Sequence, residues 1–276
     1  MYRFGWFSTG RDKAACDLLQ TAYDSLRETA DAEIEFVFCS RERGESPESD
    51  RFLDLASKLD IPIVTYSYQE FRRNRDGCKQ GDALPPWRLE YDRQVMQRLQ
   101  PFKPDLCFLA GYMLIVGAEM CRYYDMLNLH PAAPGGPAGT WQQVIWQLIA
   151  GRAEGAGVMM HLVTPQLDRG PVVTYCTFPI IGGRFDDCWR EIQGQSADEV
   201  KRNQGEDNAL FRLIRQAGCL RELPLVTTTM RAFYQGKVMV DSGKVVDATG
   251  KVINGYDLTA DIDRLIAGKG EEKQTL

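Results

Sequence analysis

The sequence predicts an α/β protein with a Rossmann-like, mostly parallel sheet and a short C-terminal β-hairpin. Short apolar runs alternate along the chain with longer segments whose apolar residues recur at helical spacing, a pattern typical of strands joined by helices. Several short runs are apolar throughout, as expected for strands that are buried on both faces. Near the C-terminus, Asp-Ser-Gly at 241–243 separates two apolar runs and predicts a hairpin turn.

The first half of the chain alternates between predicted strands and predicted helices. Strands are expected at 2–7, 34–39 and 63–65, and helices at 12–29 and 48–59. Residues 72–86 are polar and rich in turn-forming residues, so we expect an exposed loop there. A helix with one apolar stripe is expected at 87–99, and a buried strand at 106–109.

The second half is less regular. Strands are expected at 126–129, 158–163, 172–178, 233–240 and 244–253, the last two forming the hairpin. A helix is expected at 140–150, with Gly151 at its end. Residues 186–218 also have a helical pattern, with a polar interruption at 194–205 and a predicted stop at Gly218.

Length and composition are typical of a globular chain. The 276 residues carry 33 basic and 38 acidic side chains, and the net charge of −5 argues against a nucleic-acid partner. No apolar run is long enough to span a bilayer, and a strand-like run comes first, so we expect no membrane partner and no signal peptide. With no evident linker or repeat, we expect one domain over 1–268 and a charged, disordered tail at 269–276.

The eight cysteines are scattered, and none has Cys-x-x-Cys spacing. This pattern favours reduced cysteines in the cytoplasm and predicts no zinc site. Cys39 and Cys107 lie in apolar, strand-like runs, where a reduced cysteine acts as a small apolar side chain.

Both histidines of the chain, His130 and His161, lie in one stretch with Asn128 and Asp168. Asn128 and His130 are two residues apart, so they share a face at the carboxyl end of a predicted strand, where α/β sheets bind ligands. An amide can donate to a developing oxyanion, a histidine can transfer a proton, and Asp168 could orient that histidine. These groups suit attack of an amine on an activated carbonyl without a metal. The alternative is a buried polar network with no catalytic role.

A second motif precedes the first predicted helix. The strand at 2–7, the turn at 8–10 and the following helix have the order of a phosphate-binding loop. Arg11 and Lys13 could hold a phosphate, or could simply be solvated charges in the first turn. Since the motif has only one glycine, a plain strand–helix turn is equally consistent with it.

Several motifs together resemble those of the folate-dependent formyltransferases. They are Asn-Leu-His-Pro at 128–131, Gly-Val-Met-Met-His at 157–161, Asp-Arg-Gly-Pro at 168–171, Leu-Ala-Gly-Tyr-Met at 109–113 and Phe-Ser-Thr-Gly at 7–10. The resemblance covers nearly the whole chain, with extra residues near 73–88 and 193–205. It implies the formyltransferase fold, 10-formyltetrahydrofolate as the formyl donor, and no metal.

The resemblance also implies roles for individual residues. Asn128, His130 and Asp168 would be catalytic, whereas His161 would support the loop. The residues implied in folate binding are Met113, Leu114, Ile115, Val116, Val163, Thr164 and Leu167. The residues implied in acceptor binding are Thr9, Gly10, Arg11, Asp12, Lys13 and Glu206.

The implied reaction is formyl transfer to a primary amine. The family members that formylate glycinamide ribonucleotide in purine synthesis are the most similar. Another amine, such as an amino sugar nucleotide, is a second reading, and hydrolysis of the formyl-folate is a third. A folate- or nucleotide-binding sensor is the non-enzyme alternative. We expect small-molecule partners in the cytoplasm, and the sequence leaves a homodimer open.

Overall fold

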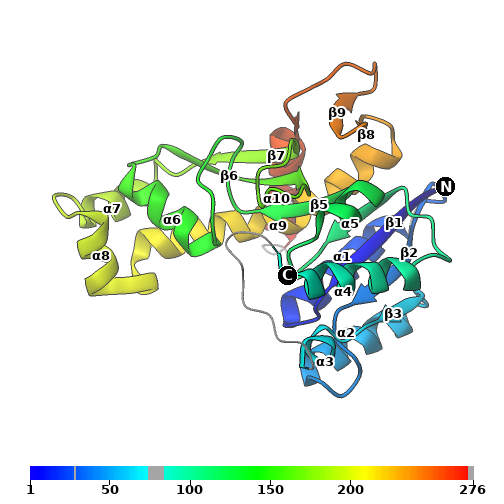
Figure 1. Ribbon diagram of the computed structural model, residues 1–276. Helices are drawn as coiled ribbons and strands as arrows, with labels where there is room; N and C mark the ends of the chain where they lie inside the picture. The colour runs from blue at the N-terminus through cyan, green and yellow to red at the C-terminus, as the bar shows by residue number, and fades with distance from the viewer. Residues whose placement is uncertain (28, 74–83, 273–276) are drawn as a thin grey trace. The chain divides into compact units, whose positions relative to one another are not determined.

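The computed structural model describes residues 1–27, 29–73 and 84–272. Contacts between residues divide the chain into two compact units. Figure 1 colours the chain by residue number. Unit 1 comprises Met1–Asn128 and Leu162–Gly170, and unit 2 comprises Leu129–His161 and Pro171–Leu276. The single domain expected over residues 1–268 stays a prediction.

Unit 1 is built on parallel strands that form from the apolar runs of the first half of the chain. These strands are β1 (Tyr2–Ser8), β2 (Ala32–Cys39), β3 (Ile63–Thr65), β4 (Leu106–Leu109) and β5 (Met126–His130). Their order is β3-β2-β1-β4-β5, and every neighbouring pair is parallel. The chain therefore moves outward from β1 first in one direction and then in the other. Ligands bind at such a switch point, beyond the carboxyl ends of the strands.

The helices described in unit 1 are α1 (Lys13–Leu26), α2 (Pro47–Lys58), α3 (Tyr68–Arg73), α4 (Pro86–Arg98) and α5 (Ala118–Tyr123). Two of them, α1 and α2, begin at a side chain that caps them. The Asp12 side chain accepts from the Ala15 N–H at the start of α1, and Ser46 caps α2 in the same way. The helices expected at 12–29, 48–59 and 87–99 are therefore confirmed. Of the loop expected at 72–86, residues 74–83 lie outside the described residues.

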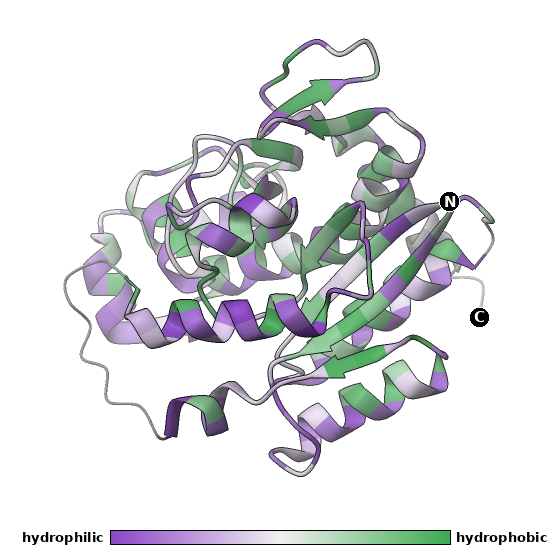
Figure 2. Ribbon diagram, turned by 45° about the vertical axis from the view of Figure 1, so that its right-hand side comes forward, coloured by the Kyte–Doolittle hydropathy of each residue, from purple (hydrophilic) through white to green (hydrophobic). Residues whose placement is uncertain are grey.

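Hydrophobic residues concentrate in the strands, while the helices carry both hydrophobic and hydrophilic residues (Figure 2). Most aromatic side chains of β1 and its neighbours are almost fully buried, including Trp6, Phe7, Phe36 and Phe108. The rings of Phe7 and Phe36 meet edge-on at 5.7 Å between centroids, and those of Trp6 and Phe108 stack at 6.0 Å. Burial of these side chains is the main force that holds the sheet against its helices.

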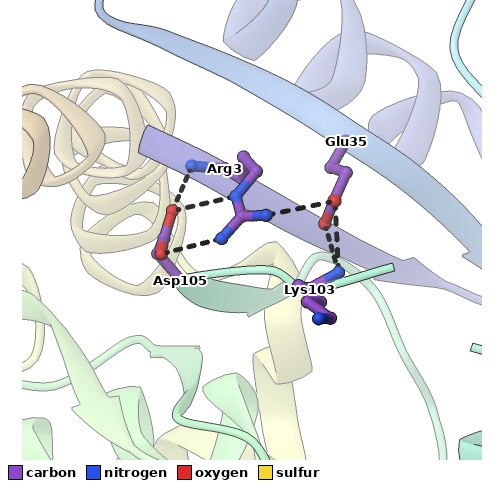
Figure 3. Close-up of polar contacts among 4 residues, drawn as sticks. All are labelled: Arg3, Glu35, Lys103 and Asp105. Atoms are coloured by element: carbon purple, nitrogen blue, oxygen red, sulfur yellow. Dashed lines mark hydrogen bonds and ion pairs between the residues drawn. The ribbon is translucent and has the colours of Figure 1, made fainter. Parts of the chain in front are cut away.

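A polar cluster joins the strands of unit 1 at their amino ends (Figure 3). The Arg3 N–H donates to Asp105 Oδ2 at 2.7 Å, and the Arg3 guanidinium lies 3.9 Å from Glu35 Oε1. The Lys103 N–H donates to Glu35 Oε2 at 3.0 Å. The cluster joins β1 and β2 to residues 103–105, which precede β4. Because its side chains are partly exposed, the cluster contributes little to stability.

Unit 2 contains an antiparallel strand pair and a separate hairpin. The paired strands are β6 (Gly155–Leu162) and β7 (Val172–Pro179), and β10 (Tyr256–Asp257) lies parallel beside β7. The hairpin consists of β8 (Val238–Asp241) and β9 (Lys244–Asp247). Ser242 and Gly243 form its turn with φ angles of 51° and 75°. The predicted mostly parallel sheet and C-terminal hairpin are both confirmed.

The helices of unit 2 are α6 (Trp141–Ala150), α7 (Arg184–Glu191), α8 (Ala197–Gln204), α9 (Ala209–Tyr234) and α10 (Thr259–Glu272), with a short 3₁₀ helix at Gly205–Asp207. A capping box of Thr140 and Gln143 begins α6, and Gly151 ends it as predicted. The polar stretch at 194–205 contains α8, which begins with a second capping box at Ser196 and Glu199. It is therefore a helix of its own and not only an interruption.

Three predictions for the C-terminal part are wrong. Gly218 does not end a helix, because α9 continues through it and through Pro224 to Tyr234. The first hairpin strand accordingly begins at Val238 and not at residue 233, and the second ends at Asp247 and not at residue 253. A proline inside a helix costs about 3 kcal/mol, which here is outweighed by burial of a long apolar face that includes Leu225, Met230 and Phe233.

The sequence also gave no sign of α10. This helix extends to Glu272 and so overlaps the tail expected at 269–276, whose residues 273–276 lie outside the described residues.

Candidate active site

Thr9 joins two loops of unit 1 at the carboxyl ends of β1 and β4. Its N–H donates to the Gly111 carbonyl at 3.1 Å, and its Oγ1 accepts from the Met113 N–H at 3.0 Å. The same oxygen lies 3.0 Å from Ser40 Oγ, at the end of β2. Gly111 has a φ of +72°, which a residue with a side chain rarely adopts. The loop expected to bind the acceptor is thus bonded directly to the loop expected to bind the folate.

The charges of the first loop are already paired within the protein. Arg11 lies 3.4 Å from the Asp12 carboxylate, and Lys13 lies 2.6 Å from that of Asp17. The Gly10 N–H donates to Ser8 Oγ at 3.1 Å. All four charged side chains are substantially exposed, so these pairs are weak and readily exchanged. An anion at this loop would gain two cations but would also meet two carboxylates.

A buried ion pair in α4 holds the loop that follows β4. Arg88 and Asp92 pair directly one helical turn apart, with side chains only 3% and 2% exposed. The Arg88 guanidinium donates to the Ile115 carbonyl at 2.6 Å, and the Asp92 carboxylate accepts from the Gly117 N–H at 2.7 Å. The pair therefore fixes the backbone on both sides of Val116. Its members are satisfied by each other and by the loop, as buried charges must be.

Aromatic rings surround this ion pair. The Arg88 guanidinium lies 5.2 Å from the ring centroid of Tyr91 and 5.8 Å from that of Tyr68. Burial raises the pKa of the Asp92 carboxyl, and Arg88 and the Gly117 N–H partly offset this rise. The role of this pair was not predicted from the sequence. The i, i+4 spacing of an arginine and an aspartate in an otherwise amphipathic helix was the available signal.

The residues expected to contact the folate leave an apolar surface on two loops of unit 1. Met113, Ile115 and Leu167 have large apolar side chains that are 51%, 42% and 59% exposed. Leu114 and Val163, from the same two loops, pack against one core cluster that also contains Tyr112 and Val116. Exposed apolar side chains beside backbone polar groups suit a flat heterocycle, so the residues fit a pteridine ring.

Asn128 and Asp168 both belong to unit 1. Asn128 lies on β5, and the Val163 N–H donates to the Met126 carbonyl of that strand at 2.7 Å. Asp168 has a φ of +54°, which is uncommon for a residue other than glycine. A Cβ atom at Gly170 would lie 1.6 Å from the Leu162 carbonyl oxygen, so only glycine fits there. The turn is thus closely packed around Asp168, and such strained positions often occur at functional sites.

His130 and His161 meet in unit 2. Their ring centroids are 6.1 Å apart with planes at 80°, and the side chains are 4% and 2% exposed. His130 Nε2 lies 3.2 Å from the Pro137 carbonyl oxygen. A carbonyl can only accept, so Nε2 carries the proton in this contact and Nδ1 is the basic nitrogen of a neutral ring.

The loop at 131–139 is held at several points in unit 2. Gln147 Nε2 donates to the Ala138 carbonyl at 3.1 Å, and the Gly136 N–H donates to that of Ala133 at 2.9 Å. Ala133 packs against Gly157 of β6, where an added Cβ would lie 2.9 Å from Ala133 Cβ and 2.7 Å from the Cys176 carbonyl oxygen. The glycine therefore makes room for the loop whose Pro137 carbonyl binds His130.

The expected site residues are divided between the two units. Of the catalytic group, Asn128 and Asp168 belong to unit 1 and His130 to unit 2. The acceptor residues at 9–13 belong to unit 1, whereas Glu206 lies in unit 2 in the 3₁₀ turn before α9, with its side chain exposed.

Metal-binding groups, disulfides and membrane-spanning helices were also sought among the described residues. Within residues 1–27, 29–73 and 84–272, no cluster of histidine, cysteine or acidic side chains could hold a metal ion. The seven cysteines in this part of the chain are all free thiols, and Cys39 and Cys107 are buried as expected. None of the described helices is both long and apolar enough to cross a membrane.

A model of the formyl transferase family matches residues 15–188, more than half of the chain. Among curated relatives, phosphoribosylglycinamide formyltransferase of Escherichia coli is 28% identical over 126 residues, or 45% of this chain and 54% of the relative. The enzyme of that name from Dictyostelium discoideum is 25% identical over 139 residues, or 47% and 64%. The chain therefore spans about half the length of the curated relatives it matches.

Solved structures share the fold. A phosphoribosylglycinamide formyltransferase from Coxiella burnetii aligns with a TM-score of 0.62 at 19% identity, covering 93% of this chain and 98% of that one. A formyltetrahydrofolate deformylase from Pseudomonas syringae aligns with a TM-score of 0.54 at 20% identity, covering 89% and 65%.

Proposed function

The chain belongs to the formyl transferase family, and from this premise we propose that it transfers a formyl group from 10-formyltetrahydrofolate to a primary amine. The observation that carries the proposal is that the matched span contains Asn128, His130 and Asp168 together. A binding protein without catalysis would have no need to keep an amide donor, a proton-transfer group and a carboxylate in this order.

In the proposed reaction, the acceptor amine attacks the formyl carbon. The Asn128 amide and protonated His130 donate to the formyl oxygen as negative charge develops there. Asp168 orients His130, and the amine proton passes to the folate nitrogen as the carbon–nitrogen bond breaks. Met113, Leu114, Ile115, Val116, Val163, Thr164 and Leu167 would hold the folate.

We propose glycinamide ribonucleotide as the acceptor, which places the chain in purine synthesis. The curated relatives named above carry that activity in their names. The acceptor phosphate would lie at Thr9 and Gly10, between the side chains of Arg11 and Lys13, and Glu206 would contact ribose hydroxyls. Asp12 and Asp17, which pair with these cations, oppose a phosphate there, so another anionic amine such as an amino sugar nucleotide is the second choice.

Hydrolysis of the formyl donor is the competing function. It is favoured by the fold shared with a formyltetrahydrofolate deformylase over 89% of this chain. The same three side chains would then act on a water molecule in place of the amine.

The test is to follow folate deformylation by absorbance with the full chain and 10-formyltetrahydrofolate, with and without glycinamide ribonucleotide. Turnover that requires the acceptor supports the transferase. Equal turnover without it would establish the hydrolase instead. Bound folate with no turnover in either case would rule out this acceptor, and amino sugar nucleotides would be the next acceptors to assay.

A further inference from the structure

A cavity of about 390 Å³ lies in unit 2, between the C-terminal part of α9, β10 and α10. Its polar wall is formed by Thr228, Arg231, Lys237, Tyr256, Asp261 and Arg264. The volume is in the range of small-molecule sites. All of these residues lie beyond the span at 15–188 that matches the family model, and none has a role in the proposed formyl transfer.

The end of α9 brings two of the cations together. Gln235 caps the helix, and Gly236 follows with a φ of +67°. The Lys237 N–H donates to the Ala232 carbonyl at 2.8 Å, and the Gly236 N–H donates to the Phe233 carbonyl at 2.9 Å. This pair of bonds is the Schellman motif. It reverses the chain and returns Lys237 to the last turn of the helix, which carries Arg231.

The cavity has an excess of positive charge. Arg264 is paired with Asp261 one turn away in α10. Arg231 and Lys237 line the same cavity, and within the described residues neither has a carboxylate partner. The carboxyl end of α9 contributes about half a negative charge, which two full positive charges outweigh. The cavity therefore favours a ligand that carries about two negative charges.

A hydroxyl group on the wall also lacks a partner. Thr228 is only 6% exposed, and its Oγ1 has no hydrogen-bond partner in the described part of the chain. The adjacent Thr229, by contrast, bonds to Thr174 Oγ1 at 2.6 Å. A buried hydroxyl without a partner costs about 1–3 kcal/mol. Thr228 lines the cavity, and rotation about its χ1 angle changes which of its side-chain atoms faces the cavity.

The α10 wall is held in place by bonds outside the cavity. Arg221 of α9 donates to Asp263 at 3.0 Å. The Thr177 N–H of β7 donates to Thr259 Oγ1 at 3.1 Å, and the Leu258 N–H donates to the Tyr175 carbonyl at 2.9 Å. The cavity is therefore preformed and does not depend on a ligand to bring α9 and α10 together.

From these observations, we propose that the cavity binds a small molecule carrying a phosphate group. Arg231 and Lys237 neutralise the phosphate dianion, and the Thr228 hydroxyl donates to one of its oxygens. Apolar contacts with Ala232, Leu258 and Leu265, which complete the wall, favour a ligand with a small apolar body over free phosphate.

The test measures binding to the full chain without formyl donor, by calorimetry at constant ionic strength. The two probes are inorganic phosphate and phenyl phosphate. Both are expected to bind saturably, and phenyl phosphate more tightly because of the apolar wall. Arg231→Gln and Lys237→Gln are each expected to weaken binding by roughly tenfold, the scale of one charge-assisted hydrogen bond. Thr228→Val should also weaken it while the protein stays folded.

Two further variants locate the site. Lys244→Gln removes an exposed cation from β9 of the same unit and is expected to bind as the wild type does. Arg11→Gln with Lys13→Gln removes the cations of the loop that the proposed function assigns to the acceptor phosphate. The proposal is overturned if phosphate binding is lost in that double variant and unchanged in both Arg231→Gln and Lys237→Gln. Because no formyl donor is present, the result is independent of the proposed reaction.

Discussion

The imidazole ring of His130 meets that of His161 edge-on, with their centroids 6.1 Å apart. Both side chains are almost completely buried, and the Pro137 carbonyl accepts from His130 Nε2 at 3.2 Å. A buried ring with these contacts has little freedom to reorient. Such restriction is what a proton-transfer group needs, because misplacement by about 1 Å can reduce a rate about 10²-fold.

Replacing His130 should therefore separate catalysis from folding. His130→Ala is expected to lower formyl transfer by at least about 10²-fold, the usual scale for loss of a general acid or an oxyanion donor. Turnover is measured by folate absorbance and folding by circular dichroism. His161→Gln is the matched control and should lose less turnover. Wild-type turnover in folded His130→Ala would remove His130 from the mechanism.

Gly157 should be sensitive to a single methyl group. In Gly157→Ala the new Cβ meets the Cys176 carbonyl oxygen at 2.7 Å and Ala133 at 2.9 Å, so the loop that holds His130 must move. We expect a loss of about 1–3 kcal/mol of unfolding free energy, as for other overpacked sites, and lower turnover. Gly155→Ala is the control on the same face of β6, because its nearest contact is at 3.6 Å. Equal effects of the two substitutions would contradict the steric explanation.

The buried ion pair of α4 should be important for stability. Asp92→Asn replaces one of the two accepting oxygens by an NH2 group, so either the Gly117 N–H or the buried Arg88 loses its acceptor; we expect a cost of about 1–3 kcal/mol in urea unfolding. The control is Glu119→Gln, which removes the exposed contact between Glu119 of α5 and Arg93 of α4. That substitution should change stability little. The Asp92 variant should also bind folate more weakly than the control, since the Ile115 and Gly117 backbone loses its support.

The dependence of stability on pH should reveal the titration of the Asp92 carboxyl group. Burial raises the pKa of Asp92 above its ordinary value of 3.8, so the folded protein holds this proton more tightly than the unfolded chain does. The contribution of Asp92 to stability therefore decreases as pH rises from 3.8 through the folded pKa, and is constant above it.

Asp92→Asn cannot titrate at this position and provides the comparison. The stability advantage of the wild type over the variant should shrink as pH rises through that window, when unfolding is measured in urea at several pH values. An advantage that grows with pH would instead mean that attraction to Arg88 outweighs burial.

Asp12 should weaken binding of an anionic acceptor. Asp12→Asn removes a negative charge beside Arg11 but keeps a side chain that caps α1 well. The KM for glycinamide ribonucleotide is expected to fall by about threefold to fivefold at low salt, and less at high salt, where exposed charges are screened. Asp17→Asn, one turn further along α1, is the control and should have a smaller effect. An unchanged KM in Asp12→Asn would indicate that the acceptor phosphate binds elsewhere.

Local sequence patterns determined most of the first half of this protein. The apolar runs became β1 to β4 within a residue or two, because a short, wholly apolar segment between turns is best buried in a sheet. Asp12, Ser46 and Thr140 cap their helices where the sequence places them, since capping depends only on groups within a few residues. That Asn128, His130 and Asp168 form one catalytic group stays a prediction, because the three residues are divided between the two compact units.

Tertiary structure decided what depends on distant partners. Gly218 and Pro224 are local helix breakers, yet α9 continues through both because its far half is buried against other elements. The Arg88–Asp92 pair can hold the loop at 112–117 only when that loop lies against α4. The cavity beside α10 likewise combines residues from 228 to 265 that share no local motif. No periodicity in the sequence encodes these contacts, because they depend on which faces the packed elements bring together.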